Sequence, residues 1–265
     1  KAQGAVVGYV HPFGGEADPL LGNLGGGKGF MVDAALETTD ALEWSDASTA
    51  GFFPLYAVWN NGLKITATGG EDSISSLHSS KLVGSFRTYV YTGNQGLSME
   101  AWFDSMKKGR AFVSSGPLLE IEIDGSLPGD TIKLPAEGGL VSLTGRLRSV
   151  TNLEDVALVC NGLEVERFPL RRNTGNLDIS YSFNVDRSGW CHLRTEGEPE
   201  FRFPMDMAYV QAFTNPIWFE VGGAPVQSAE SASYGIRWID RLQELAEAWP
   251  GWRSESEQAH VFGQF

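Results

Sequence analysis

The stretch RAFVSSGPLLEIEID, residues 110–124, divides the chain into two kinds of sequence pattern. Before it, apolar runs alternate with amphipathic segments and glycine-rich loops. After it, short runs alternate apolar and polar residues between turns. A period of two residues is typical of half-buried antiparallel strands, whereas continuous apolar runs between helical segments are typical of parallel strands covered on both faces. The pattern therefore predicts an α/β part followed by an all-β part.

Residues 1–115 are predicted to form the α/β part. The clearest helix begins at Ser98, a favourable N-cap, and ends before Gly109, with Lys107 in its last turn. Strands are expected at Ala5–Val10, Asp40–Trp44, Leu63–Thr68, Arg87–Thr92 and Arg110–Ser114.

Residues 116–225 are predicted to form an independent antiparallel β-sandwich of Greek-key type that carries no catalytic residue. Strands are expected at Leu119–Asp124, Leu140–Arg148, Val156–Asn161, Leu177–Val185, Gly189–Thr195 and Met207–Phe213, separated by turns such as Asp124-Gly125 and Asn161-Gly162. Residues 226–265 are expected to be helical. The apolar stripe of the first of these helices, which includes Trp238 and Leu242, predicts that it docks on the α/β part.

Composition excludes several classes of protein. Of the 265 residues, 42% are hydrophobic and 20% are charged, which excludes a disordered tail or a coiled coil. The net charge of −13 disfavours binding to nucleic acids or anionic membranes. No apolar run approaches the ~18 residues of a spanning helix. The two cysteines, Cys160 and Cys191, lie in strand-like runs, and buried free thiols are expected there rather than a disulfide.

The two ends of the sequence predict that the chain is part of a longer protein. Lys1 stands where a starting methionine is expected, and an apolar strand follows at once. Ser254 and Glu257 form a capping-box pattern, and apolar positions still recur at Phe265.

Candidate site residues follow two of the predicted strands. His11 follows the first strand, and Glu71 and Asp72 follow Leu63–Thr68, with His78 a few residues further on. The carboxyl ends of parallel strands meet at one edge of a sheet, where ligands bind. Carboxylates and imidazoles bind divalent metal ions. A structural histidine, a turn capped by Asp72 and an exposed His78 are the alternatives.

Other suggestive residues are interpreted as structural. Residues 22–29 approach a P-loop, but Gly29 stands where magnesium needs Ser or Thr, so a surface loop is expected and no nucleotide. His192 and His260 have no ligand-like neighbours in the sequence, so a structural or a surface position is expected for each.

Several segments, in their order along the chain, resemble one family. The segments Gly8–Pro12, Val32–Leu36 and Gly70–Ser73 are similar to the second half of a PHP (polymerase and histidinol phosphatase) catalytic domain. Four further segments resemble the carbaryl-hydrolase-like branch of PHP metallohydrolases, in which a sandwich follows the catalytic domain. They are Arg87–Tyr91, Gly109–Val113, Ser115–Leu119 and Ile236–Leu242. The resemblance implies a partial PHP-type β/α barrel in residues 1–115, a sandwich in residues 116–225, and C-terminal helices, residues 226–265, that pack on the barrel part.

The resemblance also implies a chemistry. A divalent ion, zinc, manganese or iron, would activate water to hydrolyse an ester, amide, carbamate or phosphoester of a small molecule. His11 matches the strand-end metal histidine, and Asp72 matches the aspartate of a Gly-x-Asp-x-His motif, whose histidine is replaced here by Ile74. The opening His-x-His pair of the family would precede Lys1. We therefore expect a metal-dependent hydrolase as the parent protein, and weak or no metal binding and little or no catalysis by this chain alone.

Two alternatives to the hydrolase are a non-catalytic PHP-derived binding or scaffold protein and a carbohydrate- or protein-binding module. The module would need an exposed aromatic platform among Trp190, Trp218 and Phe219. A partial barrel leaves an open sheet edge, so a homodimer through Ala5–Val10 is also expected, with Val7 and Tyr9 on an exposed apolar face.

Overall fold

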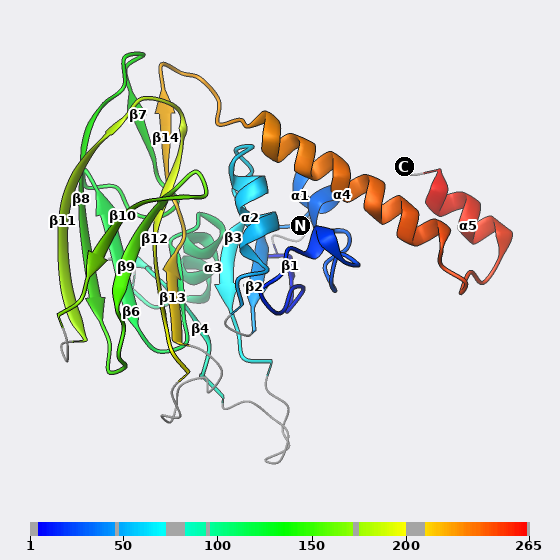
Figure 1. The fold of residues 1–265 in the computed structure, drawn as a ribbon, viewed down its shortest axis with the longest axis horizontal. Coiled ribbons are helices and arrows are strands. Elements are labelled where there is room, and N and C mark those ends of the chain that lie inside the picture. The colour runs from blue at the N-terminus through cyan, green and yellow to red at the C-terminus, as the bar shows by residue number, and fades with distance from the viewer. Residues whose placement is uncertain are drawn as a thin grey trace.

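The computed structural model describes residues 5–45, 48–72, 83–93, 96–171, 175–199 and 210–263. Within these ranges the chain is a sheet-rich α/β structure with three sheets, and the strands close no barrel. In Figure 1 the all-β part lies on the left, the α/β part lies beside it, and the C-terminal helices extend to the right. The coarse prediction of a sheet-rich structure with an α/β portion and an all-β portion is therefore confirmed, whereas the partial PHP-type barrel stays a prediction.

The first sheet is parallel and has the order β1-β2-β3. Its register places Tyr9 beside Leu42, and Leu42 beside Ala67. The sheet consists of β1 (Gly8–Tyr9), β2 (Ala41–Trp44) and β3 (Thr66–Gly69). The helical elements of this part are η1 (Pro19–Leu21), α1 (Phe30–Ala35) and α2 (Phe52–Trp59).

The all-β part contains an eight-stranded sheet and a three-stranded sheet among the described residues. The large sheet runs β10-β9-β12-β13-β5-β4, and β14 pairs with β12 and β7. Its strands are β4 (Arg87–Val90), β5 (Ala111–Ser114), β7 (Thr131–Leu134), β9 (Asp155–Cys160), β10 (Leu163–Pro169), β12 (Gly189–Gly197), β13 (Val210–Thr214) and β14 (Ile217–Val221). The small sheet runs β11-β8-β6 and consists of β6 (Leu118–Ile123), β8 (Gly139–Arg148) and β11 (Asn176–Val185).

Two expectations about strand pairing are wrong. The strands predicted at Arg87–Thr92 and Arg110–Ser114 as part of a buried parallel sheet are β4 and β5, which pair antiparallel with each other inside the large sheet. The sandwich is also not purely antiparallel, because β14 and β7 pair in parallel. An apolar run indicates that a strand is buried, but it does not indicate which strand pairs with it. The sequence pattern therefore could not distinguish parallel from antiparallel pairing.

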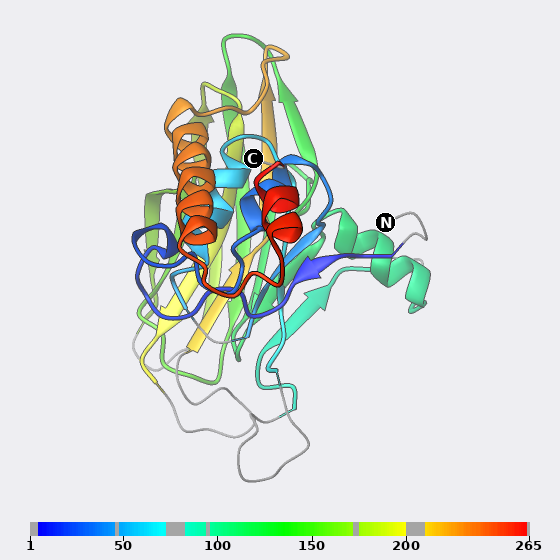
Figure 2. The same ribbon diagram turned by 90° about the vertical axis from the view of Figure 1, so that its right-hand side faces the viewer.

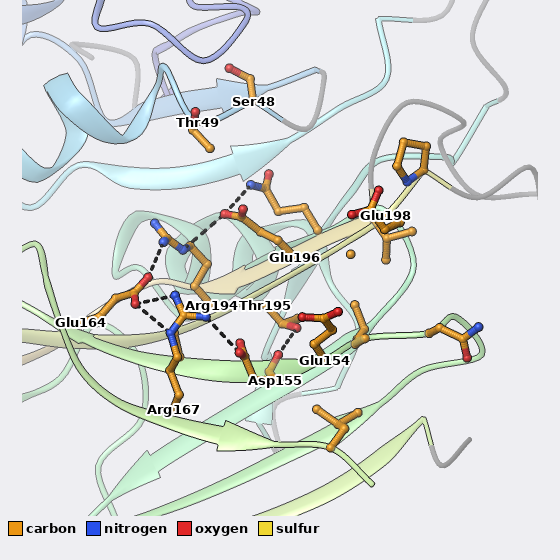
Figure 3. Close-up of a pocket in the computed structure, with 18 of the residues that line it drawn as sticks. Ser48, Thr49, Glu154, Asp155, Glu164, Arg167, Arg194, Thr195, Glu196 and Glu198 are labelled. Carbon is orange, nitrogen blue, oxygen red and sulfur yellow. Dashed lines mark hydrogen bonds and ion pairs between the residues drawn. The ribbon is translucent and has the colours of Figure 1, made fainter. Parts of the chain in front are cut away.

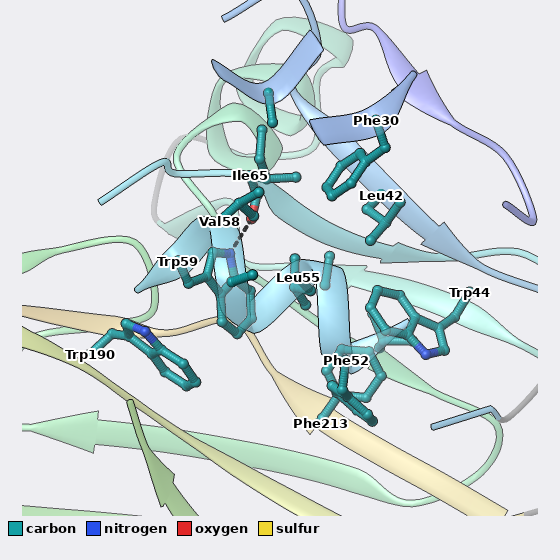
Figure 4. Close-up of a cluster of buried hydrophobic side chains, with 14 of the residues drawn as sticks. Phe30, Leu42, Trp44, Phe52, Leu55, Val58, Trp59, Ile65, Trp190 and Phe213 are labelled. Carbon is teal, nitrogen blue, oxygen red and sulfur yellow. Dashed lines mark hydrogen bonds between the residues drawn. The ribbon is translucent and has the colours of Figure 1, made fainter. Parts of the chain in front are cut away.

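Two hydrophobic cores hold the structure together. One lies between the two sheets of the sandwich and includes Leu119, Leu143 and Leu193. The other lies between the α/β part and the outer face of the large sheet. Figure 4 shows Phe52 and Trp59 from α2 together with Trp190 and Phe213 from the sandwich strands. The expectation of an independent sandwich is therefore wrong, since its outer face is buried by the α/β part.

The aromatic platform required by the binding-module alternative is not present at the predicted residues. Trp190, Trp218 and Phe219 have exposed fractions of 0%, 3% and 1%. Trp190 lies in the core shared with the α/β part, and Phe219 lies in the core between the sheets. Burial on both faces of the large sheet leaves none of the three for an external ligand.

Local signals in the sequence predicted turns and helix ends well. Asp124, Gly125, Asn161 and Gly162 all have positive φ. Asn161-Gly162 is the two-residue hairpin turn between β9 and β10, and Asp124-Gly125 turns the chain between the bridged residues Ile123 and Ser126. Helix α3 (Met99–Lys107) begins with the Ser98 hydroxyl accepting the Ala101 N–H. These features depend on a few consecutive residues, and each is confirmed.

The C-terminal helices are α4 (Ala229–Glu247) and α5 (Glu255–Phe262). Helix α4 packs against α1, α2 and η1, and Figure 2 shows it on the opposite side of the molecule from α3. Trp238 is fully buried and its Nε1 donates to the Lys28 carbonyl at 2.8 Å. Tyr234 donates to Asp18 at 2.7 Å. No helix among the described residues has the length and hydropathy needed to cross a membrane.

Cys160 and Cys191 form a disulfide, so the expectation of free thiols is wrong. The two residues face each other on the neighbouring strands β9 and β12. The two runs were recognised as strands, but only the pairing register places the sulfur atoms together.

Strand β1 lies at the edge of the first sheet and pairs with β2 alone among the described strands. Val7 and Val10 are exposed at 39% and 56%. Tyr9 differs from the expectation, because its ring packs edge-on against Phe30 and its hydroxyl donates to Asp33. A dimer through this edge stays a prediction.

Candidate functional site

The candidate site lies at the carboxyl edge of the parallel sheet. His11 follows β1, Glu43 lies near the end of β2, and Glu71 and Asp72 follow β3. The strands are parallel and adjacent, so these residues, distant in sequence, come to the same edge.

The structure brings His11 and Asp72 together. The His11 Nε2 atom lies 4.0 Å from the Asp72 Oδ2 atom, and each side chain is 54% exposed. Both residues have a left-handed backbone, with φ of 37° for His11 and 49° for Asp72. Histidine and aspartate tolerate this region better than most residues, and each one turns the chain where its strand ends.

Glu43 is a site residue that sequence reasoning missed. Its carboxylate accepts the backbone N–H of His11 and is close enough to Asp72 and Glu71 to feel their charge. Gly70 leaves room for it, because a Cβ atom there would lie 3.1 Å from Glu43 Oε2. The available signal was a single charged residue within the otherwise apolar strand Ala41–Trp44.

The electrostatics of Glu43 reflect its position. Burial raises the pKa of its carboxyl group, and the nearby charges of Asp72 and Glu71 act in the same direction. The His11 N–H and imidazole act in the opposite direction. Glu43 therefore holds a proton to higher pH than a free glutamate does.

The donor types fit a divalent cation, but their number does not complete a site. In the described part of the chain, no three His, Cys, Asp or Glu side chains form a group that could hold a metal ion. Tetrahedral coordination with bonds of about 2.1 Å would place two ligand atoms about 3.4 Å apart. The observed 4.0 Å between His11 Nε2 and Asp72 Oδ2 fits a single ion only if the ligand–metal–ligand angle is wider than the tetrahedral angle. His78 and Ile74 lie outside the described residues.

The P-loop-like segment has a structural role. The backbone N–H groups of Gly26 and Gly27 both point to the Pro12 carbonyl, at 2.8 and 3.3 Å, rather than to an open phosphate cradle. Helix α4 binds the same loop, because the Arg241 Nε atom donates to the Gly22 carbonyl at 3.0 Å. The segment thus anchors the C-terminal helix.

His192 is a buried structural residue, as the sequence suggested. Its Nδ1 atom lies 2.9 Å from the Thr214 carbonyl, which can only accept, so Nδ1 carries the proton. Its Nε2 atom then accepts the Tyr56 hydroxyl at 2.8 Å. Burial lowers the pKa of His192 to about 3, and the charge of Arg194 adds to this effect.

His192 predicts a loss of stability in mild acid. Its pKa falls from 6.5 in the unfolded chain to about 3 in the fold, so between these values the unfolded chain binds an extra proton. Stability is complete above pH 6.5 and decreases as pH falls, by about 2 kcal/mol at pH 5 from this residue. Urea unfolding between pH 8 and 5 measures the slope, and His192→Asn should flatten it. His260→Asn, which alters an exposed histidine, should not change it. Equal slopes in wild type and His192→Asn would contradict the assignment.

Comparison with known proteins adds no family. The chain matches no family model, no curated protein and no solved structure.

Proposed function

We propose that this chain forms part of a PHP-like metal-dependent hydrolase of a small-molecule ester, amide, carbamate or phosphoester. The observation that supports the proposal is the meeting of His11 and Asp72 at the carboxyl edge of the parallel sheet, 4.0 Å apart. The Glu43 carboxyl group, which is hydrogen-bonded to the His11 backbone, adds a further titratable side chain at the same edge.

The residues have separate roles under this proposal. His11 and Asp72 would hold a zinc, manganese or iron ion, which supplies an activated water when bound. Glu43 orients the His11 backbone through its hydrogen bond and holds a proton more readily than an ordinary carboxyl group. Because the described residues provide too few ligands for a closed site, we assign no catalytic step to this chain alone. The remaining ligands would come from outside these residues.

A second candidate function is a non-catalytic binding or scaffold protein of PHP ancestry. It is favoured by the lack of a three-ligand group among the described residues. It is also favoured by Ile74, which stands where the family motif has histidine and cannot bind a metal. Metal binding separates this candidate from the first.

We expect zinc or manganese titration of the chain to give one weak site that depends on Asp72. Calorimetry should show that Asp72→Asn removes this binding, because a neutral amide is a poorer ligand for a divalent ion than a carboxylate. Asp186→Asn provides the matched control, since Asp186 is exposed and lies in the sandwich. Binding that is equal in wild type and Asp72→Asn would contradict the hydrolase proposal and favour the scaffold.

A further inference from the structure

A cleft of about 980 Å³ lies between the α/β part and the sandwich. Figure 3 shows Ser48 and Thr49 on its upper wall, from the segment after β2. Its lower wall is formed by the charged side chains of β9, β10 and β12. None of His11, Glu43 and Asp72 lines it, so it is separate from the sheet-edge site.

The cleft is strongly acidic. Its described lining contains two guanidinium groups, Arg167 and Arg194, against six carboxylates. The carboxylates belong to Glu16, Glu154, Asp155, Glu164, Glu196 and Glu198. With all of these groups ionised, the walls of the cleft carry a net charge of −4. Such a cleft attracts cations and repels anions.

Both arginines are already engaged by the protein. Arg167 pairs with Glu164 at 2.6 Å and with Asp155 at 2.9 Å. Arg194 pairs with Glu164 at 3.1 Å and with Glu196 at 3.3 Å, and its guanidinium lies over the Phe52 ring. Figure 3 draws these ion pairs as dashed lines. Because they occupy the N–H groups of both arginines, few donors remain for an anionic ligand.

Three of the carboxylates are not neutralised in this way. Glu16, Glu154 and Glu198 are exposed, and none of them forms an ion pair with another described residue. They stand on both walls of the cleft, with Glu16 on the α/β side and the other two on the sandwich side.

A buried amide on β13 independently points to a ligand. Gln211 lines the cleft and is only 2% exposed. Its Nε2 atom makes a long contact of 3.5 Å to Glu196 Oε1, and its Oε1 atom is buried with no hydrogen-bond partner. A buried acceptor without a partner is costly, and a ligand N–H satisfies it.

We propose that this cleft binds an aliphatic di- or polyamine. The ammonium groups match the unpaired carboxylates, and an N–H of the ligand bonds to Gln211 Oε1. Leu153, Leu170 and Val210 provide apolar contact for the methylene segments.

Other classes of ligand fit less well. The described lining contains no aromatic side chain, so stacking of a sugar or base on it is not available. A bare metal ion lacks a three-ligand group among the described residues. A quaternary ammonium ion has no N–H to give to Gln211.

Calorimetry of the full chain with spermidine at low salt provides the test. We expect saturable binding that Gln211→Leu weakens about tenfold, since this change keeps the volume and removes the acceptor. Glu154→Gln combined with Glu198→Gln should also weaken binding about tenfold, and added salt should weaken it further. These two glutamates are exposed, so this variant should fold even if Gln211→Leu does not. Glu137→Gln combined with Asp186→Asn, at two exposed acids outside the cleft, removes the same number of charges, is the matched control and should bind as wild type does.

The selectivity of the cleft is measured by comparing its affinity for spermidine with its affinities for choline and for magnesium, each added at the same concentration of positive charge. Weaker binding of both than of spermidine supports the proposal. Failure of spermidine to saturate the wild-type chain would overturn it. Equal affinities in wild type and in the glutamate variant, or equal affinities for choline and spermidine, would also overturn it, because attraction would then come from the general negative charge.

Discussion

Replacing Trp190 with alanine is expected to lower the free energy of unfolding by about 4 kcal/mol. Trp190 is fully buried where α2 meets the large sheet, with its ring centroid 5.0 Å from those of Tyr56 and Trp59. Its Nε1 atom donates to Asn60 Oδ1 at 2.9 Å. Alanine would leave a cavity and remove the donor at the contact that joins the two parts of the molecule (Figure 4).

Urea unfolding followed by circular dichroism measures this loss without depending on tryptophan fluorescence. Trp249→Ala is the matched control, because Trp249 is 59% exposed, and it should change stability by less than about 1 kcal/mol. Trp190→Phe should fall between the two. A Trp190→Ala variant as stable as Trp249→Ala would show that the α/β part does not pack on the sandwich as described.

Removing the Cys160–Cys191 disulfide is expected to cost about 3 to 4 kcal/mol. The two cysteines are 31 residues apart in sequence, so the bridge restricts a loop of that length in the unfolded chain. The loop contains β10 and β11, which belong to different sheets of the sandwich. The bridge therefore limits the freedom of both sheets before they assemble.

The double variant Cys160→Ala/Cys191→Ala tests this prediction when it is compared with the oxidised wild type and with the reduced wild type. The reduced wild type and the double variant should unfold at similar urea concentrations, and the oxidised wild type should unfold later. If the double variant matches the oxidised wild type, the bridge does not stabilise the fold.

About half of the candidate site could be predicted from the sequence. His11 and Asp72 follow recognisable strands, and parallel strands direct their carboxyl ends to a common edge. Glu43 was missed because it lies within a strand, where a charged residue has no local pattern that separates a site residue from a solvent-facing one. Its bond to the His11 backbone depends on the β1–β2 register.

The acidic cleft between the α/β part and the sandwich could not be predicted from the sequence. Its lining comes from the loop that carries Glu16, from the β2–α2 segment, and from or next to the sandwich strands β9, β10, β12 and β13. No single one of these segments has a sequence pattern that predicts the others. The unpaired Gln211 Oε1 atom is a property of the packing around it, since the same side chain on a free surface would bond to water.

The sequence by itself determined the features that a few neighbouring residues decide. These are the Ser98 cap of α3, the positive-φ turns at Asp124-Gly125 and Asn161-Gly162, and the apolar–polar alternation of sandwich strands such as β6 and β8. Only the tertiary structure decided that β4 and β5 join the large sheet, that Cys160 meets Cys191, and that Trp190 is buried by α2. The reason is physical. A turn or cap is selected by the local conformational energies of a few residues. Strand pairing and burial instead depend on which distant segments form contacts favourable enough to offset the chain entropy lost in bringing them together.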